Sequence, residues 1–253
     1  MKHLIPIVGV ALLLAGCTGP ADEPSATPAD ELTGTLTVFA AASLTATFTE
    51  LAEQFEAAHP GVAVQTSFAG SAELVTQLQG GAKADVLATA DQKAMAKVLD
   101  LTGIPVDFAT NTLEIAVPPS NPAGIDSFAD LAGPQVKTVV CAPVVPCGAA
   151  TVALEQATGI DIHPVSEESA VTDVLGKVSS GEADAGLVYV TDVKGSKGTV
   201  KGIEFPESSK AVNTYPVATL TASTNPKAAQ AFLDFAVGAA GKKVLAAAGF
   251  GTL

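Results

Sequence analysis

The sequence predicts an α/β fold with two doubly wound lobes and a ligand cleft between them. Residues 36–101 contain three strand-then-helix units in succession, and residues 111–190 contain a second α/β set. Helices expected at residues 228–247 carry no obvious chemistry and are interpreted as packing elements. Repeated β-α units are typical of parallel sheets that have helices on both faces.

The first unit is an apolar strand, a turn of small residues and a helix. Residues 36–40 form an apolar run, and the alanines up to Ala42 have no side chain large enough to fill a cleft. Ser43 occupies the expected helix start. One helical face then follows at spacings of four, three and four residues: Leu44, Phe48, Leu51 and Phe55. This arrangement places amides and a hydroxyl at a potential anion site, although a simple helix cap is the commoner role for such a serine.

The second unit repeats the first. A partly alternating strand at residues 62–68 leads through Gly70 and Ser71 into a helix that ends at Gly80. A third strand at residues 85–89 precedes a further helix. In such a sheet, strand ends and the helix starts that follow them line one edge, where ligands bind. We therefore expect Ser43 and Ser71 to converge on one ligand.

The middle of the chain contains the second set of α/β elements, and a further strand follows it. The expected strands lie at residues 111–118, 138–142 and 185–190, and the expected helices at residues 126–133, 149–158 and about 171–178. A strand at residues 212–221 contains Pro216, which predicts an edge strand or a crossing segment. Tyr189 lies near the end of an apolar strand, where the residues alone favour a core tyrosine over a ligand donor.

The composition excludes several classes of function. The formal charge is −13, and all thirteen basic residues are lysine. Nothing forms the basic stripe that nucleic acid requires, and no arginine is present to bind a carboxylate or phosphate with two hydrogen bonds. The chain has no tryptophan, so aromatic platforms on which a sugar could stack are scarce. Its three histidines are scattered and do not have the spacing of a zinc site.

The N-terminus has the features of a targeting signal. Lys2 is followed by an apolar segment at residues 5–14 that is too short to span a bilayer. It ends in Leu-Ala-Gly-Cys at residues 14–17, which resembles the bacterial lipobox; an ordinary secretory signal is the alternative. We expect residues 1–17 to be a lipoprotein signal ending in a lipidated Cys17, and residues 18–31 to be a flexible tether. The protein is then exported and anchored to the outer face of the cell membrane.

Several segments together resemble one family. They are VFAAASL at residues 38–44, FAGS at 68–71, ADV at 84–86, ADQK at 90–93, GLVY at 186–189 and YPV at 215–217. In this order they closely resemble the molybdate-binding proteins of ABC importers, over residues 36–249. The resemblance implies a type II periplasmic-binding fold whose lobes are joined by crossing hinge strands. Residues 32–112 and 216–253 would form lobe one, and residues 113–215 would form lobe two.

The resemblance also implies the ligand and its donors. The family binds molybdate or tungstate through neutral hydrogen-bond donors, and molybdenum stays inside its oxyanion without direct protein ligands. Ser43 and Ser71 would supply hydroxyl and backbone donors, Cys147 and Val171 would supply backbone N–H groups, and Tyr189 would supply its phenol. The implied partner is an ABC permease, with no cofactor. A monomer is expected.

Two departures from the family pattern and several alternatives bear on this site. Cys147 stands where the family often has alanine, and Gly70 replaces a frequent serine. A disulfide between Cys141 and Cys147 fits an oxidising compartment, but two buried thiols fit the sequence as well. Asp85 and Asp91 are interpreted as structural groups near turns rather than as a carboxylate pair for catalysis.

Other functions are weaker alternatives. Another tetrahedral oxyanion, such as sulfate or phosphate, would suit a similar site. An exported serine hydrolase using Ser43 or Ser71 would need a nearby base. The sequence has no Gly-x-Ser-x-Gly motif, and His59 and His163 are the only histidines beyond the signal. We therefore expect a binding protein rather than an enzyme.

Overall fold

The computed structural model describes Met1 and residues 32–253. The signal, Cys17 and the tether expected within residues 2–31 lie outside the described residues. Residues 32–253 form one compact unit that contains two β-sheets. Within this part of the chain, no helix has the length and apolar character needed to cross a bilayer.

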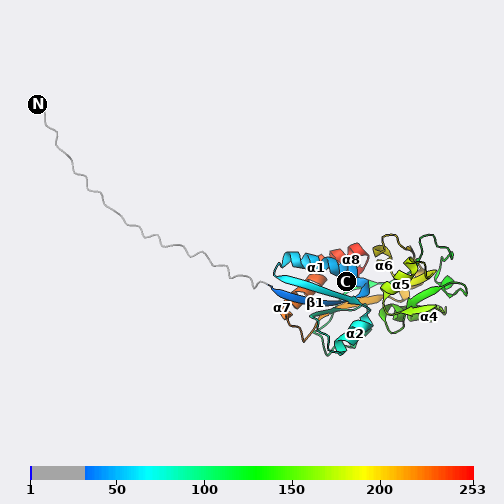
Figure 1. Ribbon diagram of the computed structural model, residues 1–253, viewed down its shortest axis with the longest axis horizontal. Coiled ribbons are helices and arrows are strands. Elements are labelled where there is room, and N and C mark those ends of the chain that lie inside the picture. Colours follow the sequence, from blue (N-terminus) through cyan, green and yellow to red (C-terminus); the bar gives the residue numbers. More distant parts are fainter. Residues whose placement is uncertain (2–31) are drawn as a thin grey trace. The chain divides into compact units, whose positions relative to one another are not determined.

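The first sheet has six strands in the order β11-β4-β10-β3-β1-β2 (Figure 1). β1 pairs in parallel with β2 and β3, whereas β10 is antiparallel to β3 and β4, and β11 is antiparallel to β4. The strands are β1 Gly34–Ala41, β2 Val62–Ala69, β3 Val86–Ala88, β4 Val106–Asn111, β10 Asn213–Thr219 and β11 Gly251–Thr252.

Helices cover both faces of the first sheet. They are the short 3₁₀ helix η1 Ala42–Leu44, and α1 Thr45–Ala58, α2 Ser71–Gln79, α3 Gln92–Ala96, α7 Pro226–Val237 and α8 Ala239–Ala248. Leu36, Val38 and Ala40 of β1 pack in the core with α1, α7 and α8, whereas Phe39 packs with α2 and α3. β1 is therefore buried on both sides, which explains its continuous apolar run.

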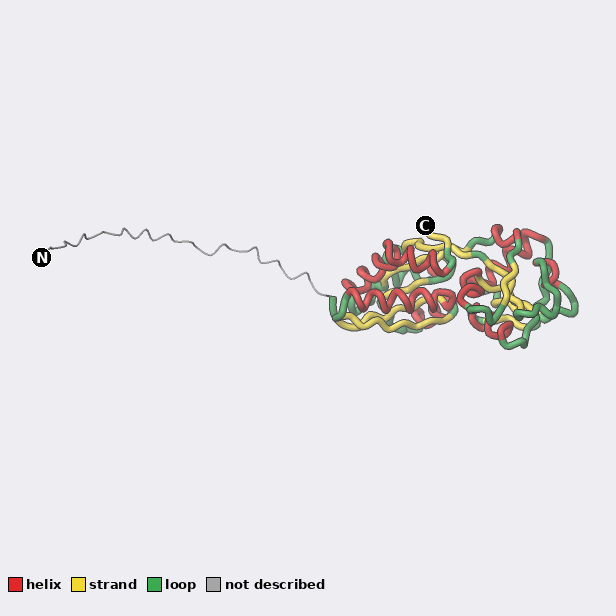
Figure 2. Tube along the Cα trace, turned by 90° about the horizontal axis from the view of Figure 1, so that it is seen from above, coloured by secondary structure: helices red, strands yellow, loops and turns green. Residues whose placement is uncertain are grey.

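The second sheet has five strands in the order β7-β6-β8-β5-β9. They are β5 Leu113–Val117, β6 Thr138–Cys141, β7 Ser166–Glu168, β8 Ala185–Tyr189 and β9 Lys201–Ile203. Its helices are η2 Phe128–Ala132, α4 Pro146–Thr158, α5 Val171–Ser179, α6 Val190–Gly195 and η3 Pro206–Lys210. Figure 2 shows the helices and strands gathered into two lobes. The expected α/β class with two lobes is confirmed.

The chain passes between the sheets twice. It leaves the first sheet after β4 and enters the second at β5, and it returns at the start of β10. Asn111 of β4 and Asn213 of β10 are partners in the antiparallel ladder, so the two crossings lie side by side. Residues 213–215, which the resemblance assigns to lobe two, hydrogen-bond in the sheet of lobe one because β10 continues through Pro216.

Two features differ from the sequence-based expectation, and a third decides between its alternatives. β10 is a crossing segment in the interior of the sheet rather than an edge strand, and the register shift between Tyr215 and Pro216 accommodates the missing proline N–H. β4, β7, β9 and β11 were not predicted. α4 begins at Pro146 rather than residue 149, because proline suits the first turn of a helix, so Cys147 is helical rather than part of a loop.

Candidate functional site

A small cavity lies where helix starts from the two lobes meet. It provides about 10 Å³ for the centre of a water-sized sphere, which is about the minimum that holds one water molecule. All five site residues named from the sequence line it: Ser43, Ser71, Cys147, Val171 and Tyr189. The other lining residues are Ala41, Ala42, Gly70, Ala90, Val145, Pro146, Ser169 and Ala170. No charged side chain is among these described lining residues.

Four helices that begin at this cavity lack a side-chain cap. The N-cap residues of η1, α2, α4 and α5 are Ala41, Gly70, Val145 and Ala170, and none makes a side-chain cap hydrogen bond. α1 continues directly from η1. The first N–H groups of a helix have no partner within the helix. The four starts therefore leave amide donors available to an anion.

Two helices that begin elsewhere, α3 and α7, are capped by side chains, whereas η3 and α8 are not. The Asp91 carboxylate accepts from the backbone N–H of Ala94 at 2.7 Å at the start of α3. Asn225 caps α7 by accepting from the N–H of Ala228. Uncapped starts thus occur elsewhere as well, and what distinguishes the four at the cavity is that they meet at one place.

Ser71 is held so that its hydroxyl hydrogen remains available. Its side chain is buried, and its Oγ accepts a hydrogen bond from the N–H of Ala90 at 3.0 Å. The carbonyl of Ala90 accepts in turn from Asn213 Nδ2 at 2.9 Å. Asn213 of the crossing strand β10 therefore holds the backbone of Ala90 in place, and the Ala90 N–H in turn holds the Ser71 side chain. The roles of Ala90 and Asn213 were not predicted, because both contacts are long-range and no local sequence pattern signals them.

Ser43 is held by a tyrosine from the C-terminal part of the chain. Its Oγ lies 3.0 Å from Tyr215 Oη. When Tyr215 donates in this bond, the Ser43 hydroxyl is free to donate into the cavity. Burial raises the pKa of Tyr215 well above its ordinary value, so its hydroxyl keeps its proton. Sequence analysis recognised the segment around Tyr215 but not this contact.

Tyr189 lines the cavity with an unused hydroxyl group. The residue is 1% exposed, and its Oη has no hydrogen-bond partner among the described residues. Burial raises its pKa well above the ordinary value, so the group is an O–H donor. A buried hydroxyl without a partner costs stability, and such groups in folded proteins require an explanation. A ligand oxygen would supply the missing acceptor.

Tyr189→Phe is expected to weaken ligand binding without loss of folding stability. The substitution removes one hydrogen bond to a charged ligand, which contributes about 1.5–3 kcal/mol, or roughly 10–150-fold in affinity. Because Oη has no protein partner among the described residues, the unfolding free energy should stay the same or rise. Calorimetric titration and urea unfolding of the two proteins measure the two effects. Unchanged affinity would remove Tyr189 from the donor set.

The buried carboxylate of Asp192 lies next to the backbone of Tyr189. Asp192 accepts a hydrogen bond from the N–H of Tyr189 at 2.9 Å at the start of α6. Burial raises the pKa of Asp192 to about 7. The group therefore gains little negative charge below neutral pH, where a full charge would oppose an anion in the cavity.

Asp192 predicts that the free energy of unfolding decreases as pH rises from about 4 to about 7. The folded protein holds this proton up to about pH 7, whereas the unfolded carboxyl loses it near its ordinary pKa of 3.8. The folded state therefore binds more protons across this window, and stability falls by roughly 2–4 kcal/mol. Above pH 7 the contribution is constant.

Urea unfolding at pH 5 and pH 8 measures this slope. Asp192→Asn keeps an oxygen that can accept from Tyr189 and should remove the Asp192 part of the difference. Glu114, whose pKa burial also raises to about 7, contributes in the same direction and should remain. An identical pH dependence in wild type and Asp192→Asn would contradict this account.

A disulfide joins Cys141 and Cys147 in the structure. Cys141 ends β6 and Cys147 lies in the first turn of α4, so the bond ties a helix start at the cavity to the second sheet. The neighbouring Gly148 is equally constrained, because a Cβ there would lie 2.0 Å from the carbonyl oxygen of Ala142. Both features hold the α4 amides in place.

Gly70 lies against the opposite lobe. A Cβ at this position would lie 2.1 Å from the carbonyl oxygen of Ser169, the residue that precedes the α5 cap. The backbone of Gly70 has φ −57° and ψ 139°, which any residue can adopt. Close approach of the two lobes, rather than backbone conformation, is therefore the reason for glycine here.

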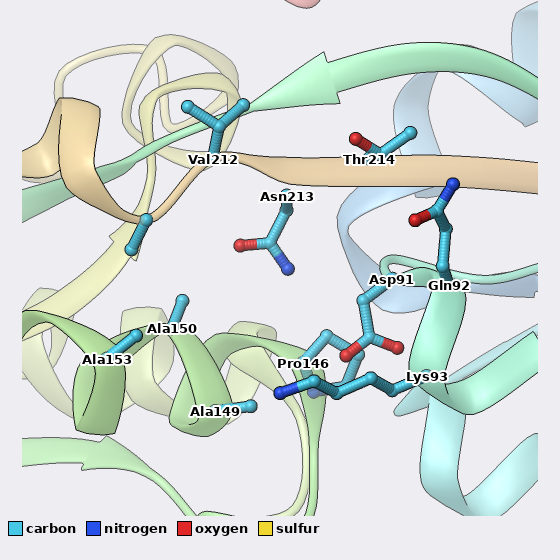
Figure 3. Close-up of a pocket in the computed structure, with 11 residues that line it drawn as sticks. Asp91, Gln92, Lys93, Pro146, Ala149, Ala150, Ala153, Val212, Asn213 and Thr214 are labelled. Atoms are coloured by element: carbon cyan, nitrogen blue, oxygen red, sulfur yellow. The ribbon is translucent and has the colours of Figure 1, made fainter.

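A larger hollow lies between the lobes next to the return crossing. It measures about 200 Å³ on the same basis as the first cavity and shares Pro146 with it. Figure 3 shows Asn213 projecting into this space, between Asp91 and Lys93 on one side and the alanines of α4 on the other. Asp91 and Lys93 carry opposite charges at this hollow, whereas the smaller cavity has no charged lining residue and collects four uncapped helix starts, which makes it the better anion site.

The aspartates and histidines have other positions. The Asp85 carboxylate accepts from the N–H groups of Thr37 and Thr224 and from Ser223 Oγ. Together with the Asp91 cap, this confirms structural roles for both residues. His59 follows the far end of α1 and packs on Phe55. Neither His59 nor His163 lines the cavity, so Ser43 and Ser71 have no histidine base there.

Comparison with known proteins gives a family and named relatives. The family model for bacterial extracellular solute-binding proteins matches residues 36–251. The chain is 48% identical to the molybdate-binding protein ModA of Mycobacterium tuberculosis, over 95% of this chain and 94% of that protein. It is 35% identical to the molybdate-binding protein ModA of Escherichia coli, over 88% and 90% of the two chains.

Solved structures share the fold. The periplasmic molybdate-binding protein of Azotobacter vinelandii superimposes with a TM-score of 0.74 at 21% identity, covering 85% of this chain and 98% of that one. The sulfate-binding protein SubI of Mycobacterium tuberculosis gives 0.71 at 20% identity, covering 85% and 86%. Because the family model matches residues 36–251 and the two relatives align with most of the chain, the chain belongs to the bacterial extracellular solute-binding proteins.

Proposed function

We propose that this protein captures molybdate, or tungstate as its close analogue, and delivers it to the permease of an ABC importer. The observation that carries the proposal is the small cavity, which combines four uncapped helix starts with the hydroxyl groups of Ser43, Ser71 and Tyr189. The two ModA proteins at 48% and 35% identity support molybdate as the ion. The protein acts as a monomer without a cofactor, and molybdenum remains inside its oxyanion.

Neutral donors suit reversible capture. Amide and hydroxyl dipoles can bind a dianion without a buried arginine or lysine, which would be left as an unpaired buried charge after release. The site consists of donors, so a ligand that carries its own O–H finds no acceptor. Hydrogen phosphate is such a ligand, and its unmatched O–H lowers its affinity.

Sulfate is the second candidate ligand. The fold is shared with a sulfate-binding protein, so the fold alone does not select the ion. Sulfate has the same charge and shape as molybdate but shorter bonds. The donors around the cavity would therefore have to reach a smaller ion, so discrimination against sulfate would have to come from the size of the ligand-bound cavity.

Calorimetric titration of the full chain with molybdate, tungstate, sulfate and phosphate tests the proposal. We expect tight binding of molybdate and tungstate and no measurable heat from phosphate. Binding of sulfate alone would replace molybdate with the second candidate. Absence of binding by either metal oxyanion would reject the proposed function.

The protein is further proposed to be a lipoprotein on the outer face of the membrane. Support comes from the lipobox-like residues 14–17 and from the extracellular family to which the chain belongs. Metabolic labelling with an alkyne-modified fatty acid should mark the wild type and leave Cys17→Ala unlabelled. Equal labelling of both proteins would place the lipid elsewhere or exclude it.

A further inference from the structure

Each of the two strands that cross between the sheets carries a buried asparagine. Asn111 ends β4 where the chain leaves the first sheet, and Asn213 begins β10 where the chain returns. The two residues lie opposite each other in the antiparallel ladder and are 5% and 7% exposed. A buried amide without hydrogen-bond partners is costly, so the partners of these side chains indicate what the crossing strands hold in place.

The two asparagines form hydrogen bonds in different directions. Asn213 Nδ2 donates to the carbonyl of Ala90, whose N–H holds Ser71 in lobe one. Asn111 Nδ2 donates instead to Thr191 Oγ1 at 2.8 Å, in the first turn of α6 in lobe two. One crossing strand therefore supports a proposed ligand donor of lobe one, and the other is bonded to a helix of lobe two.

The helix α6 begins at the proposed ligand donor of lobe two. Its N-cap residue is Tyr189, and Thr191 lies two residues further along. A second hydrogen bond ties this helix start to the outgoing crossing, from the N–H of Val190 to the carbonyl of Thr112 at 3.1 Å. Thr112 also donates its N–H to Asn111 Oδ1 at 3.1 Å, which fixes the orientation of the asparagine amide. The position of Tyr189 thus depends on the crossing strand as well as on its own sheet.

The ring of Tyr189 contacts a residue of lobe one. It packs edge-on against Tyr215, with ring centroids 6.0 Å apart and planes at 68°. Tyr215 in turn shares a hydrogen bond with the hydroxyl of Ser43. A rotation of the start of α6 would therefore move the Tyr189 hydroxyl relative to Ser43. Such a shift weakens binding, because the groups of a binding site have to lie within about 0.5 Å of their productive positions.

We propose that Asn111 is a positioning residue for oxyanion capture and acts through Thr191 on the Tyr189 hydroxyl. This inference rests on the proposed function, because it concerns a donor to the bound oxyanion. Asn111 and Thr191 do not line the cavity, so they act through the tyrosine rather than on the ligand. Their bond holds the first turn of α6 so that the Tyr189 hydroxyl is in place before the ligand arrives. A donor that is ordered in advance lowers the entropic cost of binding.

Molybdate titration of the full chain by calorimetry, together with urea unfolding, tests this role. Thr191→Val keeps the shape of the side chain but removes the acceptor, and it should weaken binding by roughly 3–10-fold, a part of the value of a hydrogen bond to a charged group. Thr191→Ser retains a hydroxyl and should retain wild-type affinity. Thr138→Val is the matched control, because Thr138 is buried and its hydroxyl donates to the carbonyl of Leu131 within lobe two. The control should lose stability and keep wild-type affinity.

A double-mutant cycle separates positioning from a general loosening of the fold. If the Asn111–Thr191 bond acts through the tyrosine, Thr191→Val should cost no more than about twofold in affinity in the Tyr189→Phe background, whereas independent effects would multiply. Thr191→Ala, which places no methyl group against the Asn111 amide, serves for the same cycle if Thr191→Val does not fold.

Three outcomes would overturn this inference alone, in a wild type that binds molybdate. They are wild-type affinity in Thr191→Val, losses that multiply in the double variant, and an equal loss of affinity in Thr138→Val. A wild type that binds neither molybdate nor tungstate would instead reject the proposed function, and this inference with it.

Discussion

Gly70→Ala should reduce oxyanion affinity by roughly 5–150-fold while leaving each lobe folded. The new methyl carbon would lie 2.1 Å from the carbonyl oxygen of Ser169, and a backbone oxygen cannot move aside as a flexible side chain can. Overpacking of this kind typically costs about 1–3 kcal/mol. Here the cost falls on the approach of the two lobes, because Gly70 caps α2 in lobe one and Ser169 precedes α5 in lobe two.

Calorimetric titration measures the affinity, and small-angle scattering with ligand measures closure. The variant should remain more extended than the ligand-bound wild type. Gly176→Ala is the matched control, since a Cβ at that helical position meets nothing within 4 Å. Wild-type affinity and compaction in Gly70→Ala would show that the lobes do not need to approach this closely to bind.

Ser71→Ala should weaken binding by roughly 10–150-fold and also lower stability. The change removes a hydroxyl donor to a charged ligand, worth about 1.5–3 kcal/mol. It also leaves the N–H of Ala90 without its buried acceptor, which costs about 1–3 kcal/mol of unfolding free energy. Removal of the Ser71 oxygen should therefore lower both ligand affinity and stability. Removal of the Tyr189 hydroxyl should lower affinity only, because that hydroxyl has no partner among the described residues.

Titration and urea unfolding report the two losses independently. Ser179→Ala provides a control, because Ser179 is exposed in α5 and donates to the carbonyl of Gly176 within its own helix. That variant should keep wild-type affinity. If Ser71→Ala loses stability but not affinity, Ser71 is a structural serine and the donor assignment fails.

Local sequence patterns were sufficient for the positions of Ser43 and Ser71. Each follows an apolar strand and a turn of small residues, and helix starts after parallel strands share one edge of the sheet. The same reasoning placed Tyr189 at a strand end. What these patterns did not provide was the orientation of the hydroxyl groups, which depends on contacts between residues far apart in the chain.

Long-range contacts explain what was missed. Tyr215 meets Ser43 across 172 positions and Asn213 meets Ala90 across 123 positions, so no local pattern could reveal either bond. β4 escaped detection because its residues, VDFATN, mix polar and apolar types without clear alternation. Pro216 suggested an edge strand or a crossing segment, and the structure has the second, because a register shift lets Pro216 lie inside the sheet.

The uncapped helix starts also bear on the charge of the proposed ligand. Each helix N-terminus carries about half a positive charge, and four of them meet at the cavity without a side-chain cap. Glu73 and Asp173 lie in the first turns of α2 and α5 and reduce this positive potential, whereas the first turns of η1 and α4 contain no acidic residue. The positive potential that remains should attract a dianion more strongly than a monoanion of the same shape, so the backbone would contribute to selection by charge as well as by shape.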